Sequence, residues 1–430
     1  MSQLSKTEKR LSILIGLQIG VCCISLVIVA AGVLRSIDHY LFHIQFRLDA
    51  LWIAFLAVAA FSTTGGILFV FCRFSFGYFV GFYFFSMILS FLWLTCFSDL
   101  PYNHLLAGCS AAISFIIFLL PALLLSAPLK YSPELSIANF DRIISLIICL
   151  VAVVVLSGTY YSFAFPVGDL ASAREGVVMP APIRYLVWTS SSALLPFAFA
   201  YCLARRWYRR LIVVVVLQLL LFPVTVTKTA LFAPFWLAFL HLLSRLTTAR
   251  SAVILSLLLP MSFVLLLLPF GPVADLLFST LNFRMVAIPA LALDIYNDFF
   301  SRNQLTLFCQ ISILKPLLAC PYHDQLSIIM QNQYHLGYFN ASLFATEGIA
   351  SVGAWLAPLS ALLCGIVVSV GNRVSAGLPP SFVLVSAGVL VQVLLNVPIT
   401  VATVTHGAVL LCLMWYFTPR AIFVRTENIR

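Results

Sequence analysis

The stretch "LSILIGLQIGVCCISLVIVAAGVL" at residues 11–34 indicates the fold class of this chain. It contains no charged residue, and about 24 residues are enough for a helix to cross a hydrocarbon layer of ~30 Å. Comparable runs recur along all 430 residues, which are 62% hydrophobic and only 9% charged. A soluble domain needs more polar surface than that. The runs are continuous rather than alternating, so the sequence predicts an all-α, polytopic integral membrane protein rather than a barrel.

About twelve transmembrane helices are expected, and they divide the chain into three parts. Residues 1–272 would hold helices one to nine, 273–342 one large periplasmic loop with short interfacial helices, and 343–430 helices ten to twelve with a cytoplasmic tail. The first run follows basic residues, as a signal peptide would, but it is too long for one and is interpreted as a retained span. The expected spans are 11–34, 51–72, 76–97, 105–127, 143–164, 185–204, 211–227, 229–246, 252–272, 343–369, 381–397 and 399–418.

The distribution of Lys and Arg predicts the orientation. Placing the N-terminus in the cytoplasm leaves about two thirds of the 24 Lys and Arg residues on the cytoplasmic side, as the positive-inside rule requires. The motif "RRWYRR" at 205–210 is the strongest single anchor. Both termini are therefore expected in the cytoplasm. The net charge of +10 is spread over many short loops, which argues against a nucleic-acid partner.

The stretch "LDIYNDFFSRNQ" at 293–304 is unusually polar for this chain. It lies in the expected large loop, whose first half is apolar and aromatic and favours a helix at the membrane interface. Loops longer than about 15 residues are usually functional or disordered, and this one is too apolar for disorder. We therefore expect the active or binding surface here. The alternative is an ordinary solvated loop.

Segments of this region resemble the O-antigen polymerase family, the oligosaccharide repeat-unit polymerases of bacterial surface polysaccharide. They are "FRMVAIPALALDIYNDFFSRNQLTLF" (283–308), "PYHDQ" (321–325) and "YFNASLFATEGIASVGAWLAPL" (338–359). Upstream, "VTKTALFAP" (226–234) is similar to the family's hydroxyl–Lys–hydroxyl segment. The resemblance covers residues 223–360 and departs from the family after Phe-Phe, where the family often has Pro and this chain has "SRNQ".

The resemblance implies a membrane glycosyltransferase at the periplasmic face of a bacterial inner membrane. In that reaction a growing glycan on undecaprenyl diphosphate is transferred to the non-reducing hydroxyl of one new lipid-linked repeat unit. The partners would be these two lipid-linked glycans and membrane lipid, with a chain-length regulator as a further protein to consider. No cofactor or metal ion is expected, because the sequence has no HExxH motif, no Cys/His set with zinc spacing and no Gly-rich phosphate loop.

Cations are expected to bind the leaving diphosphate. Negative charge builds on that group as the glycosidic C–O bond breaks, and a guanidinium is best placed to bind it because it contacts phosphate oxygens bidentately. The candidates are Arg284, Arg302 and Lys228. Each has a structural alternative. Arg284 would otherwise anchor an interfacial helix, Arg302 would pair with the carboxylate four residues earlier, and Lys228 would be an ordinary lysine at a hairpin tip.

The acceptor hydroxyl needs a base, which has to be a carboxylate or an imidazole. Asp298, Glu347 and His335 are the candidates. Glu347 lies just inside an apolar segment, where an ionisable group is costly without a partner; its alternative is a structural ion pair. Asp298 would otherwise cap a helix, and His335 would be a hydrogen-bonded structural residue.

Two other functions fit the same composition. An O-antigen ligase uses the same lipid-diphosphate donor and depends more on a histidine in the large loop. A lipid-linked oligosaccharide flippase or exporter would line a midplane cavity with polar groups, and this chain has few of them. Among the eleven cysteines, Cys309 and Cys320 share the expected loop. They can pair in an oxidising periplasm, and the sequence leaves that pairing open.

Overall fold

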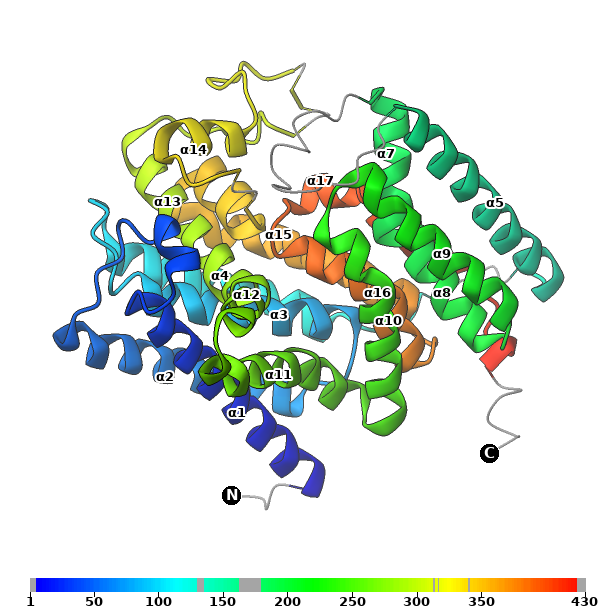
Figure 1. Ribbon diagram of the computed structural model, residues 1–430, viewed down its shortest axis with the longest axis horizontal. Coiled ribbons are helices and arrows are strands. Elements are labelled where there is room, and N and C mark those ends of the chain that lie inside the picture. Colours follow the sequence, from blue (N-terminus) through cyan, green and yellow to red (C-terminus); the bar gives the residue numbers. More distant parts are fainter. Residues whose placement is uncertain are drawn as a thin grey trace. The chain divides into compact units, whose positions relative to one another are not determined.

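The computed structural model describes residues 5–129, 135–161, 179–311, 314, 315, 317–338 and 341–423. These residues form helices and connecting segments without a strand; one isolated antiparallel bridge joins Ile44 and Ser98 (Figure 1). The all-α prediction is therefore confirmed for the described part of the chain.

Eleven helices in the described residues are long and apolar enough to cross a membrane, which supports a multi-pass membrane protein. They are Lys6–Ala30, Leu48–Phe71, Phe76–Leu94, His104–Leu124, Ile137–Tyr161, Ala181–Ala204, Tyr208–Thr225, Lys228–Leu246, Ala249–Phe270, Pro272–Arg302 and Phe344–Ser375. Two shorter apolar helices follow, Pro380–Leu394 and Ala408–Phe417.

The helices are labelled in chain order. They are α1 (Lys6–Ala30), η1 (Arg35–Tyr40), α2 (Leu48–Phe71), α3 (Phe76–Leu94), α4 (His104–Leu124), α5 (Ile137–Tyr161), α7 (Ala181–Thr189), η2 (Ser190–Leu194), α8 (Leu195–Ala204), α9 (Tyr208–Thr225), α10 (Lys228–Leu246), α11 (Ala249–Leu267), η3 (Leu268–Phe270), α12 (Pro272–Thr280), η4 (Phe283–Ala287), α13 (Ile288–Arg302), α14 (Leu326–Tyr334), η5 (Phe344–Ala350), α15 (Ser351–Ser375), α16 (Pro380–Leu394), α17 (Ile399–Val404) and α18 (Ala408–Phe417).

The chain forms two compact units. The first comprises Met1–Leu125, Arg250–Ser369 and Leu394–Ile399. The second comprises Ser126–Ala249, Val370–Val393 and Thr400–Arg430. Each unit is therefore built from segments that are distant in sequence.

Helix α3 is the centre of the first unit, because every one of its residues is buried. A helix that is apolar on all sides is stable only when neighbours surround it, and α3 packs against α1, α2, α4 and α13. Close approach depends on small residues: a Cβ on Gly81 would lie 2.7 Å from Leu119 of α4. This packing places α13 directly against the core.

Two regions differ from the sequence-based expectation. The region expected to begin the large loop contains Pro272–Arg302, a nearly continuous helix of 31 residues. Pro289 lies at the second position of α13, directly after the π-helical turn Phe283–Ala287, where the regular α-helical hydrogen-bond pattern begins anew. The expected span 399–418 is divided into α17 and α18, because Gly407 has a φ of +76° that a helix cannot accommodate.

The second unit holds the basic motif at 205–210. Arg205 forms an ion pair with Asp141 of α5 at 2.8 Å, and Tyr201 donates a hydrogen bond to the same carboxylate at 2.7 Å. The guanidinium groups of Arg205 and Arg210 lie 5.1 and 4.1 Å from the centre of the Trp207 ring. Part of this cationic motif is therefore held by a carboxylate and by an aromatic face.

Candidate functional site

Helix α13 carries the polar stretch that stood out in the sequence. Its residues from Pro289 to Phe300 are all buried, including Asp294 and Asp298, whose exposure is zero. The two carboxylates are four residues apart and so lie on one face of the helix. We call this pair the carboxylate face of α13. Buried carboxylates are costly unless donors satisfy them, so their partners identify what this face is built to hold.

Asp298 is bound by two side chains. Its Oδ2 accepts a hydrogen bond from Tyr334 of α14 at 2.6 Å and forms an ion pair with Arg302, one turn later on α13. The structural alternative considered for Arg302, a pair with Asp298, is therefore present. The other oxygen, Oδ1, is buried and has no hydrogen-bond partner among the described residues. Burial, together with Asp298, raises the pKa of Tyr334.

Asp294 is held by residues from two loops that lie far away in sequence. Ser98 donates a hydrogen bond to Oδ2 at 2.7 Å, and the Tyr102 hydroxyl donates to Oδ1. The Nε2 atom of His43 lies 3.0 Å from Oδ2, although its N–H direction is not aligned for a hydrogen bond. Burial, and then Asp294, raises the pKa of Tyr102 well above its usual value.

The loops that supply these partners are paired with each other. The Ile44–Ser98 bridge is flanked by hydrogen bonds from Asp99 N to His43 O and from Gln45 N to Phe97 O, both 2.8 Å. The segment after α1 and the segment between α3 and α4 thus form one short backbone pairing. Asp294 of α13 joins this pairing through side chains of both segments.

Sequence reasoning did not single out Asp294, His43 or Tyr102. Asp294 lay in the quoted polar stretch, so its unusual polarity was an available signal. His43 and Tyr102 are isolated polar residues in short loops, and nothing local distinguishes them from ordinary loop residues. Their role follows only from the packing of α3 against α13.

Arg284 lies in η4, a π-helical turn immediately before α13. Such turns are rare and often occur at functional sites. The side chain is exposed and makes no hydrogen bond or ion pair with any residue that the structure describes. Tyr40 belongs to the segment after α1. Its ring lies 5.5 Å from the ring of Phe283, and Tyr40 interacts electrostatically with Arg284.

Glu347 is buried in η5, the π-helical turn that precedes α15. Thr346 donates a hydrogen bond to its Oε2 at 2.6 Å. The turn η5 packs against α13, and Glu347 interacts electrostatically with Tyr296 of that helix. Glu347 therefore belongs to the same packed region as the carboxylate face.

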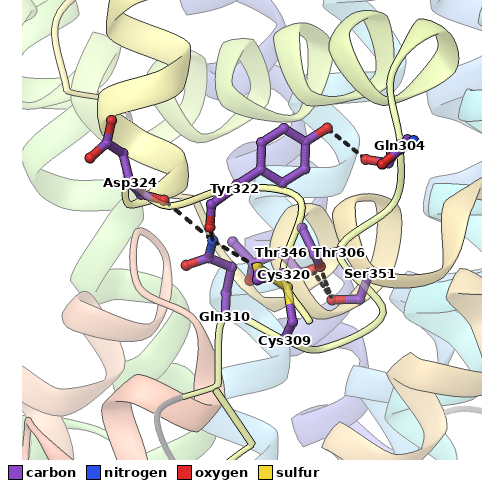
Figure 2. Close-up of a disulfide and its surroundings, with 9 residues drawn as sticks. All are labelled: Gln304, Thr306, Cys309, Gln310, Cys320, Tyr322, Asp324, Thr346 and Ser351. Carbon is purple, nitrogen blue, oxygen red and sulfur yellow. Dashed lines mark hydrogen bonds between the residues drawn. A yellow bond between two sulfur atoms is a disulfide. The ribbon is translucent and has the colours of Figure 1, made fainter. Parts of the chain in front are cut away.

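A disulfide between Cys309 and Cys320 closes the segment that follows α13. Figure 2 shows its surroundings: Gln310 donates to the carbonyl of Tyr322 at 3.2 Å, and the Tyr322 hydroxyl donates to the carbonyl of Gln304 at 2.6 Å. Thr306 N donates to Ala350 O at 2.8 Å, which fastens the segment to the end of η5. The pairing that the sequence left open is thus present in the structure.

The disulfide-closed segment also packs on α13. The Tyr322 ring lies 6.0 Å from the rings of both Phe299 and Phe300. These are the two phenylalanines of the polar stretch, so the segment covers the end of α13 that carries Asp298. The segment that packs on this end of α13 is therefore cross-linked by a disulfide.

The two remaining candidates are His335 and Lys228. His335 is exposed at the end of α14 with a φ of +57°, and its side chain has no hydrogen bond to the described residues. Lys228 belongs to the second unit, at the first position of α10 after the left-handed residue Val226. The site in the first unit therefore consists of Arg284, Arg302, Asp298, Glu347 and the unexpected Asp294 with its partners.

The described residues bring no three His, Cys, Asp or Glu side chains together in a way that would hold a metal ion. The chain matches no protein-family model, no curated protein and no solved structure.

Proposed function

We propose that this chain polymerises undecaprenyl-diphosphate-linked oligosaccharide repeat units into a bacterial surface polysaccharide at the periplasmic face of the inner membrane. The observation that carries the proposal is Arg284, an exposed guanidinium that forms no hydrogen bond or ion pair with the described residues. It lies at the start of the same helix that holds the buried carboxylates Asp294 and Asp298.

A cation in this position is available to an anionic ligand. Its side chain is exposed, and the helix Pro272–Arg302 that carries it is apolar enough to associate with a membrane. A lipid diphosphate supplies two phosphate groups at the membrane surface, and a guanidinium binds such oxygens bidentately. The same contact stabilises the charge that develops on the diphosphate as it leaves. Arg284 therefore has the chemistry of a leaving-group ligand.

The contacts of α13 support a position on the side of the membrane opposite the termini. Phe283 contacts Tyr40 after α1, and Asp294 contacts Ser98 after α3. With a cytoplasmic N-terminus, the segments after α1 and after α3 both lie outside. Contacts with these segments near the beginning of the helix and again at Asp294 support a location of this part of the helix near the outer surface. The Cys309–Cys320 disulfide fits the oxidising periplasm.

Asp298 and Arg302 have a structural role beside any chemical one. Their ion pair, with Tyr334, fastens α14 to α13. Arg302 keeps a half-exposed side chain, 52% of it accessible, so it can contact a second phosphate oxygen without leaving Asp298. The roles of Asp298, Glu347 and His335 as bases and of Lys228 as a phosphate ligand stay predictions.

The test is the surface-polysaccharide ladder of cells in which the gene is deleted, compared with cells complemented by wild type, Arg284→Ala or Arg284→Lys. We expect the deletion to leave lipid core with a single repeat unit, wild type to restore the ladder, and Arg284→Ala to fail. Arg73→Ala is the matched control, because Arg73 is exposed in the α2–α3 loop of the same unit.

Other outcomes would replace the proposal. Full-length chains that accumulate on the undecaprenyl carrier would identify a ligase. Lipid-linked single units that accumulate on the cytoplasmic side would identify a flippase. A complete ladder in cells that carry Arg284→Ala at normal protein level would remove Arg284 from the reaction.

A further inference from the structure

His43 is a buried imidazole whose hydrogen-bonding capacity is not used. Its exposure is 4%, and neither ring nitrogen has a hydrogen-bond partner among the described residues. Buried polar groups in folded proteins are almost always satisfied, and each exception calls for an explanation such as a bound ligand or a catalytic role. The position of this side chain against Asp294 suggests which explanation applies.

Asp294 is fixed independently of His43. Ser98 donates to Oδ2, Tyr102 donates to Oδ1, and the helix that carries Asp294 is buried on all sides. The carboxylate lies 3.0 Å from Nε2, and its negative charge favours the tautomer that carries its proton on that nitrogen. The Nδ1 atom is then a lone-pair acceptor. A carboxylate beside an imidazole is the general arrangement of a base that accepts a proton from a hydroxyl.

The same loop reaches Arg284. Tyr40 contacts Phe283 and interacts with Arg284, and His43 follows three residues later. Three residues of extended chain span at most ~11 Å between Cα atoms. One loop therefore contacts the helix at both places, near Arg284 through Tyr40 and at Asp294 through His43.

We propose that His43 is the catalytic base that activates the acceptor sugar hydroxyl, and that Asp294 is its positioning residue. This inference rests on the proposed polymerase function. The acceptor oxygen forms a bond to the anomeric carbon of the donor. The C–O bond to the diphosphate breaks, and undecaprenyl diphosphate leaves with the electron pair while Arg284 holds it. The hydroxyl proton passes to Nδ1 of His43 and then to water.

The carboxylates nearby already accept from other side chains. Oδ2 of Asp298 is occupied by Arg302 and Tyr334, while its Oδ1 has no partner among the described residues, and Oε2 of Glu347 accepts from Thr346. An imidazole that keeps one lone pair can accept the hydroxyl proton directly. His43 is thus a base with an unused acceptor nitrogen, on a side chain that no cation holds in an ion pair among the described residues.

The test uses the full-length protein in the deletion strain. We would compare wild type, His43→Ala, His43→Gln and Asp294→Asn, with His323→Gln as control because His323 is exposed. Membrane levels of each variant and formation of the Cys309–Cys320 disulfide report folding. Imidazole is then added to the medium of the His43→Ala strain, whose missing ring leaves space for it.

We expect at least a tenfold loss of long chains in His43→Ala and His43→Gln, a smaller loss in Asp294→Asn, and a full ladder in His323→Gln. Added imidazole should restore part of the ladder in His43→Ala and none in His43→Gln, where the glutamine side chain fills the site. A full ladder in either His43 variant overturns the inference, and so does a folded His43→Ala that imidazole does not restore. If the deletion itself leaves the ladder intact, the polymerase function fails as well.

Discussion

Tyr334 donates a hydrogen bond to Asp298 over 2.6 Å and thereby joins two helices whose residues are 36 positions apart. Asp298 is fully buried and already paired with Arg302 of its own helix. The bond makes α14, a short helix in a segment with little other secondary structure, part of the surface of α13. One phenol and one carboxylate therefore help to hold α14 on α13.

Replacing Tyr334 by Phe should loosen α14 without unfolding the unit. A hydrogen bond to a charged acceptor contributes roughly 1.5–3 kcal/mol, and Arg302 remains to neutralise Asp298. We expect faster hydrogen exchange in residues 326–334, measured by mass spectrometry on the detergent-solubilised protein. Tyr208→Phe, at an exposed tyrosine of the second unit, should leave exchange in α14 unchanged. Unchanged protection in Tyr334→Phe would show that α14 is held by other contacts.

The attachment of α14 should also weaken in alkali. Burial and Asp298 raise the pKa of Tyr334 in the folded protein above its ordinary value of about 10. A group whose folded-state pKa is raised contributes its full stability below the unfolded value, and that contribution is lost as the pH rises through the folded-state pKa. Limited proteolysis of the 303–338 region should therefore accelerate above pH ~10. Tyr334→Phe should be cleaved at a rate that lacks this alkaline increase.

Reduction of the disulfide should release the segment that follows α13. The bond closes a loop with a sequence separation of 11, and a cross-link of that size is worth about 3 kcal/mol of restricted chain entropy. Cys309→Ser and Cys320→Ser should each expose residues 303–325 to protease, as fragment masses would reveal. Cys109→Ser, at an exposed cysteine of α4, is the matched control. Equal resistance in all three variants would mean that Tyr322 and Thr306 suffice to hold the segment.

Two glycines should respond oppositely to the same substitution. A Cβ on Gly365 of α15 would overlap the backbone carbonyl of Phe118 and lie 2.7 Å from Pro121, whereas a Cβ on Gly20 of α1 meets nothing within 4 Å. Gly365→Ala should cost about 1–3 kcal/mol of stability through overpacking. Gly20→Ala should be neutral or gain up to ~1 kcal/mol because alanine favours the helix. Thermal unfolding in detergent, followed by size-exclusion chromatography, measures both, and equal midpoints would contradict the α4–α15 packing.

The amino-acid sequence by itself determined the helical membrane class. Uninterrupted apolar runs leave a backbone in lipid no alternative to internal hydrogen bonds, so this conclusion needs no knowledge of packing. It also determined relationships within one turn of helix. Asp298 and Arg302 are four residues apart, and their ion pair follows from helical geometry alone.

The tertiary structure decided which residues that are distant in sequence contact one another. The sequence around His43, Ser98 and Tyr102 gives no sign that these residues contact Asp294. Their proximity results from the packing of α13 on α3 and from the pairing of two loops. The disulfide between Cys309 and Cys320 likewise follows only from the folded chain, which brings the two cysteines together. Hydropathy indicates whether a segment lies in lipid or in water, but it does not indicate which other segments pack against it. Neighbours are selected by side-chain shape and by the need to satisfy buried polar groups, which only the folded chain brings together.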